Sequence, residues 1–436
     1  MVKRSDKYHW HIGTKPPIID PHSLIKHKIV RGYLERYISV LMSNYNMDKL
    51  KLSIVDGFAG GGEYSAQDGS KFYDGSPLIV LNAIADQEIA LNIGRKKTRT
   101  VDAKYYFVEK IESNFQYLDN MLRARFLASR FDNDIQLLRG SFQNNAKKII
   151  TDIKRRAGGE RAIFLLDQYA YDQVTGSMLR SIFSQVKGAE IILTFAVDSL
   201  ISFLADNETS RKKLAEMGID SHIDWAELEA LRSAPQNVWR SAIQRNLAKG
   251  LVEASGAKNF TIFYITPMGN TAWTYWFIHL SNSAKARDVM MELHWQSANH
   301  FSHYLEPDLF TLGYQANRDK VATRQNSLEL GEVHQFDAIA ASRCKTGLAE
   351  KLVPIIYDGK PIPFSKLIET VGSLTPATSG MIREALDPAI RCGDILVRSA
   401  DGITRSKGSS IKAGDVLAAS PQKSLISLSG INFRLL

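Results

Sequence analysis

The segment from Leu52 to Gly62 most constrains the fold of this 436-residue chain. The short apolar run from Leu52 to Val55 predicts a buried strand, which ends at Asp56. Four of the six residues that follow Asp56 are glycine, and glycine lets the backbone adopt positive φ and approach a ligand closely. Open α/β sheets bind nucleotide-like ligands at loops of this kind, outside the carboxyl ends of their strands. The segment therefore predicts the first strand and loop of a ligand-binding sheet.

Strand and helix patterns alternate from this loop to about residue 280. Seven apolar runs predict strands: Leu52–Asp56, Lys104–Glu109, Ile135–Leu138, Ala162–Asp167, Glu190–Phe195, Phe260–Thr266 and Thr271–Leu280. Helical patterns separate the first five, which indicates a parallel, doubly wound α/β sheet. A turn joins the last two, so we expect a seven-stranded Rossmann-like sheet that ends in an antiparallel hairpin.

The chain is long enough for more than one domain. We expect a first domain over residues 1–330, with a mostly helical insertion at about 199–255. A second unit follows at 331–436, where three helical patterns precede a hairpin signal at Asp401-Gly402. Three helices followed by a hairpin is the order of a winged helix, so the C-terminal unit is predicted to be winged-helix-like.

Composition narrows the class of protein. The chain carries a net charge of +9 and only two cysteines, Cys344 and Cys392. Basic surface attracts phosphate backbones, so nucleic acid is an expected partner. The cysteine count argues against disulfides and a cysteine zinc site, and the spacing of the four N-terminal histidines fits no metal site. No apolar run is long enough to span a membrane, and we expect a soluble cytoplasmic protein.

Residues at the ends of the first two strands form a candidate cofactor site. The form D-G-F-A-G-G-G resembles the first motif of S-adenosylmethionine (SAM) dependent methyltransferases, in which the acid binds the methionine part of the cofactor. Glu109 ends the second strand, where an acid can receive both ribose hydroxyls of a nucleoside. The alternatives are a tight turn without ligand and a solvated glutamate. The predicted cofactor residues of this region are Asp56, Phe58, Ala59, Gly60, Gly61, Gly62 and Glu109.

Two later strand ends complete the candidate site. Ser141 and Phe142 follow the third strand, and in this fold that loop lies beside the adenine. Asp167, Gln168 and Tyr169 follow the fourth strand, where methyltransferases place groups that handle the substrate. Asp167 could accept from an amine, Gln168 could recognise a base edge and Tyr169 could stack on a base. Amino-methylating enzymes often have D-P-P-Y there, whereas this chain has D-Q-Y-A, so a purely structural role for Asp167 stays open.

These motifs together resemble a known family, the three-Cys-motif partner proteins. The resemblance covers Trp10 to Gln296 and includes Asp56-Gly57-Phe58-Ala59-Gly60, Asp74-Gly75-Ser76-Pro77-Leu78 and Asp167-Gln168-Tyr169. The chain is more distantly similar to 23S ribosomal RNA adenine methyltransferases. The resemblance implies a SAM-binding fold and a partner protein with a three-cysteine, radical-SAM-like motif.

We therefore expect a SAM-dependent methyltransferase that acts on a DNA or RNA base. The C-terminal unit is predicted to bind nucleic acid through Arg383 on its third helix and through Arg398 and Arg405 in the wing. The main alternative is a non-catalytic partner subunit that binds SAM or a nucleotide together with nucleic acid. A methyltransferase for proteins or small molecules fits the core equally well but leaves the C-terminal unit without a role.

Overall fold

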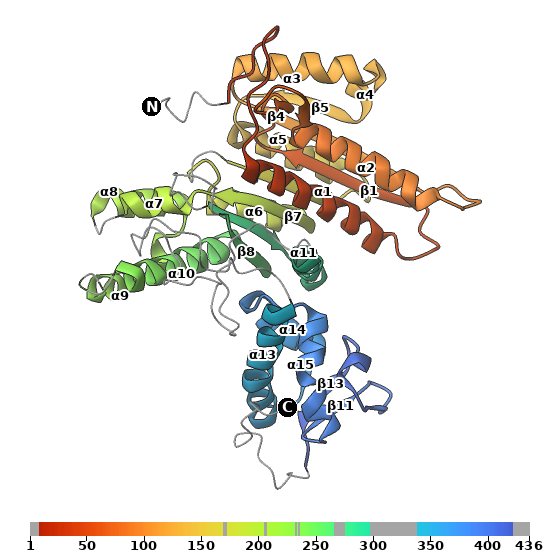
Figure 1. Ribbon diagram of the computed structural model, residues 1–436, viewed down its shortest axis with the longest axis vertical. Helices are drawn as coiled ribbons and strands as arrows, with labels where there is room; N and C mark the ends of the chain where they lie inside the picture. The colour runs from red at the N-terminus through yellow and green to blue at the C-terminus, as the bar shows by residue number, and fades with distance from the viewer. Residues whose placement is uncertain are drawn as a thin grey trace. The chain divides into compact units, whose positions relative to one another are not determined.

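The computed structural model describes residues 8–168, 172–204, 207–231, 233, 236–265, 275–296 and 338–421. They fall into two compact units, one ending with residue 296 and the other beginning with residue 338. Both units are drawn in Figure 1 and are described separately below.

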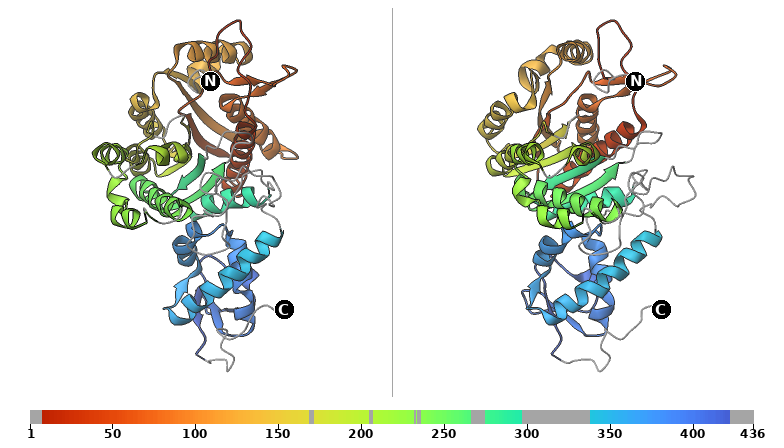
Figure 2. Two further views of the ribbon diagram at one scale, coloured as in Figure 1. Left: turned by 60° about the vertical axis from the view of Figure 1, so that its left-hand side comes forward. Right: turned by 90° about the vertical axis from the view of Figure 1, so that its left-hand side faces the viewer.

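A seven-stranded sheet forms the centre of the first unit (Figures 1 and 2). Its strand order is β5-β4-β1-β6-β7-β9-β8. Strands β5, β4, β1, β6 and β7 are parallel, and β9 runs antiparallel to β7 and β8. The seven strands are β1 (Lys49–Asp56), β4 (Thr100–Glu109), β5 (Ile135–Arg139), β6 (Arg161–Asp167), β7 (Gly188–Phe195), β8 (Asn259–Ile265) and β9 (Tyr275–Ser281). The prediction of a seven-stranded, mostly parallel sheet with a terminal hairpin is confirmed.

Helices cover both faces of this sheet, which explains its continuous apolar runs. The crossover helix α2 (Ser76–Asn92) leads from β1 to β4, and α6 (Gly176–Gln185) leads from β6 to β7 in the opposite direction across the sheet. Right-handed crossovers therefore place α2 and α6 on opposite faces. Helix α1 (Pro21–Leu41) packs beside α2 and α11 (Ala284–Gln296), whereas α6 packs against α5 (Phe142–Arg155) and α10 (Gln236–Ser255). Ile54 and Val55 of β1 are fully buried as a result.

The remaining helices of this unit are α3 (Glu112–Arg125), α4 (Ala128–Asn133), α7 (Val197–Phe203), α8 (Glu208–Met217) and α9 (Trp225–Ala230). The last three lie with α10 in the segment predicted to be mostly helical. The Asp74-Gly75-Ser76-Pro77 motif predicts Ser76 as the N-cap of α2, but Gly75 is the N-cap and Ser76 is already helical, so the Ser76 hydroxyl does not cap this helix.

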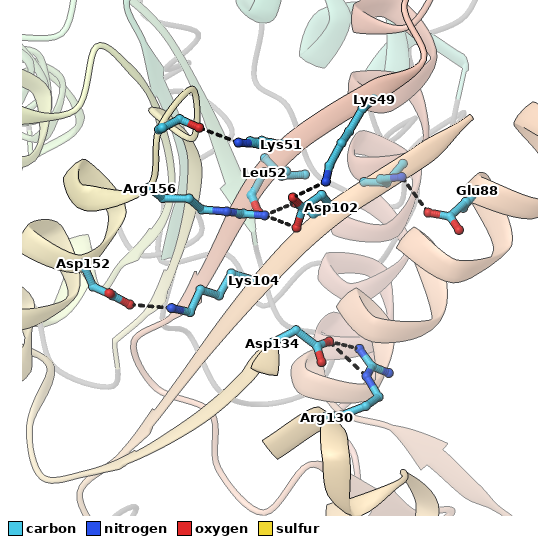
Figure 3. A network of polar contacts seen from close by, with 12 residues as sticks. Lys49, Lys51, Leu52, Glu88, Asp102, Lys104, Arg130, Asp134, Asp152 and Arg156 are labelled. Carbon is cyan, nitrogen blue, oxygen red and sulfur yellow. Dashed lines mark hydrogen bonds and ion pairs between the residues drawn. The ribbon is translucent and has the colours of Figure 1, made fainter. Parts of the chain in front are cut away.

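Polar contacts hold together the edge of the sheet where β1 and β4 begin (Figure 3). The guanidinium of Arg156 donates to the carbonyl oxygen of Leu52 at 2.8 Å and also pairs with Asp102. Lys49 pairs with the same carboxylate at 2.9 Å. Lys104 and Asp152 form a further pair at 2.9 Å, which links β4 to α5. Arg156, Lys49 and Lys104 each pair with a carboxylate of the fold. Their positive charges are therefore not free to bind a ligand.

The second unit combines three helices with a small antiparallel sheet. Its elements are α13 (Ala338–Asp358), β10 (Ile362–Pro363), α14 (Phe364–Val371), α15 (Ser379–Arg391), β11 (Ile395–Arg398), β12 (Thr404–Arg405) and β13 (Val416–Ala419). The strand order is β10-β13-β11-β12. The sequence predicts the three helices and a hairpin at Asp401-Gly402. It does not predict β10 and β13, because strands of two and four residues give too short a pattern. Leu348, Leu352, Leu386 and Leu417 are fully buried in its core.

Candidate functional site

Three carboxylates lie at the carboxyl edge of the sheet. Asp56 pairs in register with Phe107 of β4 and with Leu165 of β6, and two residues beyond these partners come Glu109 and Asp167. The chain passes from β1 outward to β4 and β5 and then returns to β6, so the topological switch point lies between β1 and β6. Ligands of open α/β sheets bind at this point. The structure thus brings the acids of the three predicted strand ends together on one edge.

The glycine loop is tied to the strands on both sides of β1. The N–H of Gly57 donates to the carbonyl oxygen of Leu165 in β6 at 2.9 Å, and the N–H of Ala59 donates to that of Val108 in β4 at 3.0 Å. Gly60 and Gly62 have φ values of +60° and +86°, where side chains other than hydrogen are strained. The loop is therefore a rigid extension of the sheet.

Glu109 is buried and receives loop amides on both carboxylate oxygens. Oε2 accepts from the N–H of Gly60 at 2.9 Å, and Oε1 accepts from the N–H of Ile111 at 2.7 Å. Burial raises the pKa of Glu109 above its usual value, although both N–H groups favour the charged form. The Lys110 N–H and the Asn114 side chain favour the charged form as well, so several donors of the chain fix this carboxylate in place.

Asp56 has one carboxylate oxygen without a partner. Its side chain is buried, and Oδ1 accepts from the N–H of Phe58 at 3.1 Å. Oδ2 is buried and makes no hydrogen bond. Burial raises the pKa of Asp56 to about 7, although the nearby Ser76 hydroxyl and the Phe58 N–H favour the charged form. A buried acceptor left unpaired costs free energy, so this oxygen is suited to bind a donor or a cation.

Asp167 forms an ion pair with Lys26 of α1. The ammonium nitrogen lies 2.5 Å from Oδ2, and half of the Asp167 side chain stays exposed while that of Lys26 is buried. Partial burial acts to raise the pKa of Asp167, but the Lys26 ammonium outweighs it and holds this pKa below the usual value. Asp167 is thus an ionised carboxylate that solvent, and hence a substrate, can reach.

The other predicted substrate residues are less exposed. Gln168 is buried, and its Oε1 accepts from the N–H groups of Gln173 and Val174 at 3.1 and 2.9 Å. This amide oxygen therefore holds the backbone at Gln173 and Val174, while the buried Nε2 has no hydrogen-bond partner. Tyr169 lies outside the described residues.

Ser141 and Phe142 both make contacts that stabilise the fold around the glycine loop and α5. Ser141 is the N-cap of α5, because its hydroxyl accepts from the N–H of Asn144 at 3.3 Å. Phe142 is 1% exposed, and its ring packs beneath the glycine loop, close to Gly57 and Phe58. Their predicted place beside an adenine stays a prediction.

Trp10 covers the glycine loop, which the sequence analysis did not anticipate. Its ring lies against Gly60 and Gly61, its Nε1 donates to the carbonyl oxygen of Glu63 at 2.6 Å, and its N–H donates to Asn114 Oδ1 at 2.9 Å. The Trp10 ring thus occupies the space that a side chain at position 61 would need. No local pattern could have revealed this, since the partners are about 50 and 100 residues apart.

Two further side chains approach the acids. Tyr64 packs edge-on against Trp10, and its environment includes the charges of Asp167 and Asp56. His27 follows Lys26 and lies 6.0 Å from Tyr64, measured between ring centroids. Burial and the adjacent Lys26 ammonium lower the pKa of His27 to about 4, so its imidazole is neutral at pH 7. Its buried Nδ1 has no hydrogen-bond partner.

The three arginines predicted to bind nucleic acid differ in their surroundings. Arg405 makes a two-pronged pair with the buried Asp415 at 2.8 and 3.2 Å. Arg383 donates to the Ile411 carbonyl oxygen at 3.1 Å and lies over the Phe364 ring. Arg398 is exposed on β11. Arg383 and Arg405 therefore stabilise the second unit, and of the three Arg398 is the most accessible.

The residues that the structure describes contain no group of three or more His, Cys, Asp or Glu side chains arranged to hold a metal ion. Within the same part of the chain, no helix is both long and apolar enough to cross a membrane.

No protein-family model matches the chain, and no curated protein matches it. Among solved structures, it is similar to protein LPL1258 from Legionella pneumophila, with 12% identity, a TM-score of 0.35, and coverage of 60% of this chain and 85% of that one. It is also similar to Trm1 from Pyrococcus horikoshii in complex with SAM, with 11% identity, a TM-score of 0.29, and coverage of 92% of both chains. The plantazolicin methyltransferase BamL, bound to S-adenosylhomocysteine, has 9% identity, a TM-score of 0.24, and coverage of 60% of this chain and 88% of BamL. These values assign no family and give no support to the three-Cys-motif partner resemblance, so the function has to be inferred from the residues of this chain.

Proposed function

We propose that this protein is a SAM-dependent methyltransferase that acts on nucleic acid. The observation that carries the proposal is the buried, unpaired Oδ2 of Asp56, at the switch point of the sheet and beside Glu109. A cationic amine would satisfy this oxygen and favour the ionised form of an acid whose pKa is raised to about 7. Glu109 ends the neighbouring strand β4, where an acid can receive ribose hydroxyls. These two acids therefore fit an aminoacyl nucleoside such as SAM.

The protein would contribute to catalysis mainly by positioning the acceptor against the methyl group of the cofactor. SAM supplies an electrophilic methyl group when it is bound. The ionised, half-exposed Asp167 would orient an amine of the acceptor by accepting one of its N–H bonds. The Lys26 ammonium keeps this carboxylate charged, and Gln168 holds the backbone at Gln173. The predicted stacking role of Tyr169 belongs to this proposal.

Nucleic acid is the proposed acceptor because of charge and of the second unit. The chain carries a net charge of +9. The order α13, β10, α14, α15, β11, β12 and β13 supports the predicted winged-helix-like unit. Arg398 is exposed on β11, the strand that enters the hairpin, where a wing would contact phosphate. Arg398 is therefore the first of the three predicted arginines to test.

A non-catalytic partner subunit is the second candidate. It is favoured by two contacts: Trp10 covers the glycine loop, and the Gln168 amide oxygen is used within its own loop. Such a subunit would bind SAM or a nucleotide and nucleic acid, and would contact a partner protein without transferring a methyl group.

Calorimetric titration of the full chain with SAM and with S-adenosylhomocysteine tests the proposal. We expect binding by the wild type, loss of binding in Asp56→Asn and Glu109→Gln, and unchanged binding in the control Asp86→Asn, which alters an exposed acid of α2. Labelled methyl transfer to pools of DNA and RNA then separates the two candidates. Binding without transfer would favour the partner subunit, and no binding by the wild type would refute the cofactor site.

A further inference from the structure

Three aromatic side chains, which we call the aromatic cluster, pack together beside the glycine loop. Tyr64 belongs to β2 (Glu63–Ser65), which directly follows the loop. Its ring meets the rings of Trp10 and Tyr8 edge to face, at centroid distances of 5.3 and 6.0 Å. The rings of Tyr8 and Trp10 stack on each other at 6.1 Å. Because Trp10 also lies against Gly61, the aromatic cluster is held in place at the loop.

The Tyr64 side chain lies near the acids of the candidate site. Burial and the charges of four carboxylates raise the pKa of Tyr64 above its usual value. Three of these carboxylates end the strands β6, β1 and β4, and the fourth is the N-cap of α1. The interaction between charges falls off with distance, so the aromatic cluster adjoins the strand ends. The four carboxylates are those of Asp167, Asp56, Asp20 and Glu109.

The described part of the chain balances the negative charge at the strand ends only in part. Asp167 pairs with Lys26. Asp56 and Glu109 accept from N–H groups and polar side chains, and no cation of the described residues forms an ion pair with either of them. The His27 imidazole adds no charge at pH 7, because burial and the Lys26 ammonium lower its pKa to about 4. A positively charged ligand is therefore attracted to this site, and a phosphate group is repelled.

A sulfonium cation suits this combination of aromatic rings and carboxylates. Its sulfur is bonded to three carbons and has no N–H or O–H group, so it cannot be recognised as an ordinary hydrogen-bond donor. Such a cation is recognised through its charge, for which the face of an aromatic ring is a suitable partner. S-Adenosylhomocysteine differs from SAM by the absence of the methyl group and, with it, of this positive charge. The two ligands therefore differ in the property to which the site responds.

We propose that Tyr64 and the carboxylates around it select a cofactor with a positively charged sulfur, so that SAM binds in preference to S-adenosylhomocysteine and to nucleotides with phosphate groups. This inference rests on the proposed function and specifies the cofactor of the same site. The Tyr64 ring attracts the sulfonium, while Asp56 binds the amino end of the same ligand. Of the two ligands considered for a partner subunit, SAM and a nucleotide, the charges of the site favour SAM.

Calorimetric titration of the full chain with SAM, S-adenosylhomocysteine and ATP tests this selection. We expect the wild type to bind SAM roughly tenfold more tightly than S-adenosylhomocysteine and to bind no ATP. Tyr64→Leu should weaken SAM binding roughly three- to thirtyfold, the range of a cation–π contact, and change the affinity for S-adenosylhomocysteine by less than about twofold. Tyr64→Phe keeps the ring and should keep the wild-type preference. The control Phe72→Leu changes an exposed ring on the opposite face of the same hairpin, since Phe72 pairs with Ser65, and should alter neither affinity.

Equal affinities of the wild type for SAM and S-adenosylhomocysteine would overturn this inference, as would ATP binding as strong as that of SAM. Equal loss of both SAM and S-adenosylhomocysteine in Tyr64→Leu would also overturn it, because a general disturbance of the site weakens both ligands. If the leucine variant does not fold, the three ligands on the wild type still decide. Each of these results leaves SAM binding by the wild type in place, whereas its absence would refute the proposed function and this inference with it.

Discussion

The ring of Trp10 fills the space that a side chain at Gly61 would need. A Cβ at position 61 would lie 2.2 Å from Trp10 Cγ, far inside van der Waals contact. Gly61 does not have positive φ, so the constraint is the contact itself and not the backbone conformation. Trp10 therefore determines that position 61, the third glycine of the loop, has no room for a side chain.

Gly61→Ala should lower the free energy of unfolding by about 1–3 kcal/mol, the usual cost of overpacking. In the background of Trp10→Ala the same change should cost much less, because the clashing ring is gone. Thermal unfolding of the two single variants and the double variant measures this coupling. Additive losses would mean that Trp10 does not lie on the loop in solution.

Asp56→Asn should stabilise the protein while abolishing SAM binding. The unfolded chain releases the Asp56 proton near its usual pKa of 3.8, whereas the folded protein holds it up to about pH 7. The folded state therefore loses stability as the pH rises from about 4 to about 7, by at most roughly 4 kcal/mol. Asparagine does not titrate, so the variant should be the more stable protein at pH 8 and lose this advantage at pH 4. Unfolding at both pH values, with Asp86→Asn as control, measures the difference, and an equal shift at both would contradict the assigned pKa.

Lys26→Met should raise the pKa of Asp167. The cation is removed while the partial burial that disfavours the carboxylate remains. In the wild type the lowered pKa stabilises the fold above the usual pKa of an aspartate, and this contribution disappears as the pH falls through the lowered value. Titration of the Asp167 carboxyl carbon by NMR should show the upward shift in Lys26→Met and little change in Lys26→Arg. A wild-type pKa in the methionine variant would show that the pair does not form.

Arg405→Ala should destabilise the second unit, whereas Arg398→Ala should not. The first change leaves the buried Asp415 carboxylate without its cation, and the second removes an exposed side chain. Arg398→Ala should instead weaken nucleic-acid binding and flatten its salt dependence. Thermal unfolding and oligonucleotide binding at two salt concentrations separate the effects. Equal unfolding midpoints for the two variants would contradict the structural role of Arg405.

The main sheet could be predicted because its strands are strongly patterned. Runs such as Ile54-Val55 and Phe164-Leu165-Leu166 are buried on both faces, and turn signals bound them. Their alternation with helices then restricts the topology to a few possibilities. The hairpin of β2 (Glu63–Ser65) and β3 (Phe72–Asp74) was missed, because strands of three residues are too short to show a period.

The candidate site was only partly predictable. Asp56, Glu109 and Asp167 could be found because each ends a predicted strand, and parallel strands bring their ends to one edge. Trp10, Lys26 and Tyr64 could not, because they reach the site through contacts between distant parts of the chain. The glycines were interpreted as space for a ligand, but the structure shows that Gly61 makes room for Trp10.

The position of β1 in the sheet has a consequence for synthesis of the chain. This strand is made before both of its neighbours in the sheet, β4 and β6. The ribosome must therefore have released Leu165 before β1 can complete its pairing along both edges. Until then Ile54 and Val55 of the nascent chain are not fully buried. Pairing between strands that are far apart in the sequence is also slow. The first unit therefore cannot complete its fold until the chain through β6 has been synthesised. During that time the apolar strand β1 is exposed to chaperones and to aggregation.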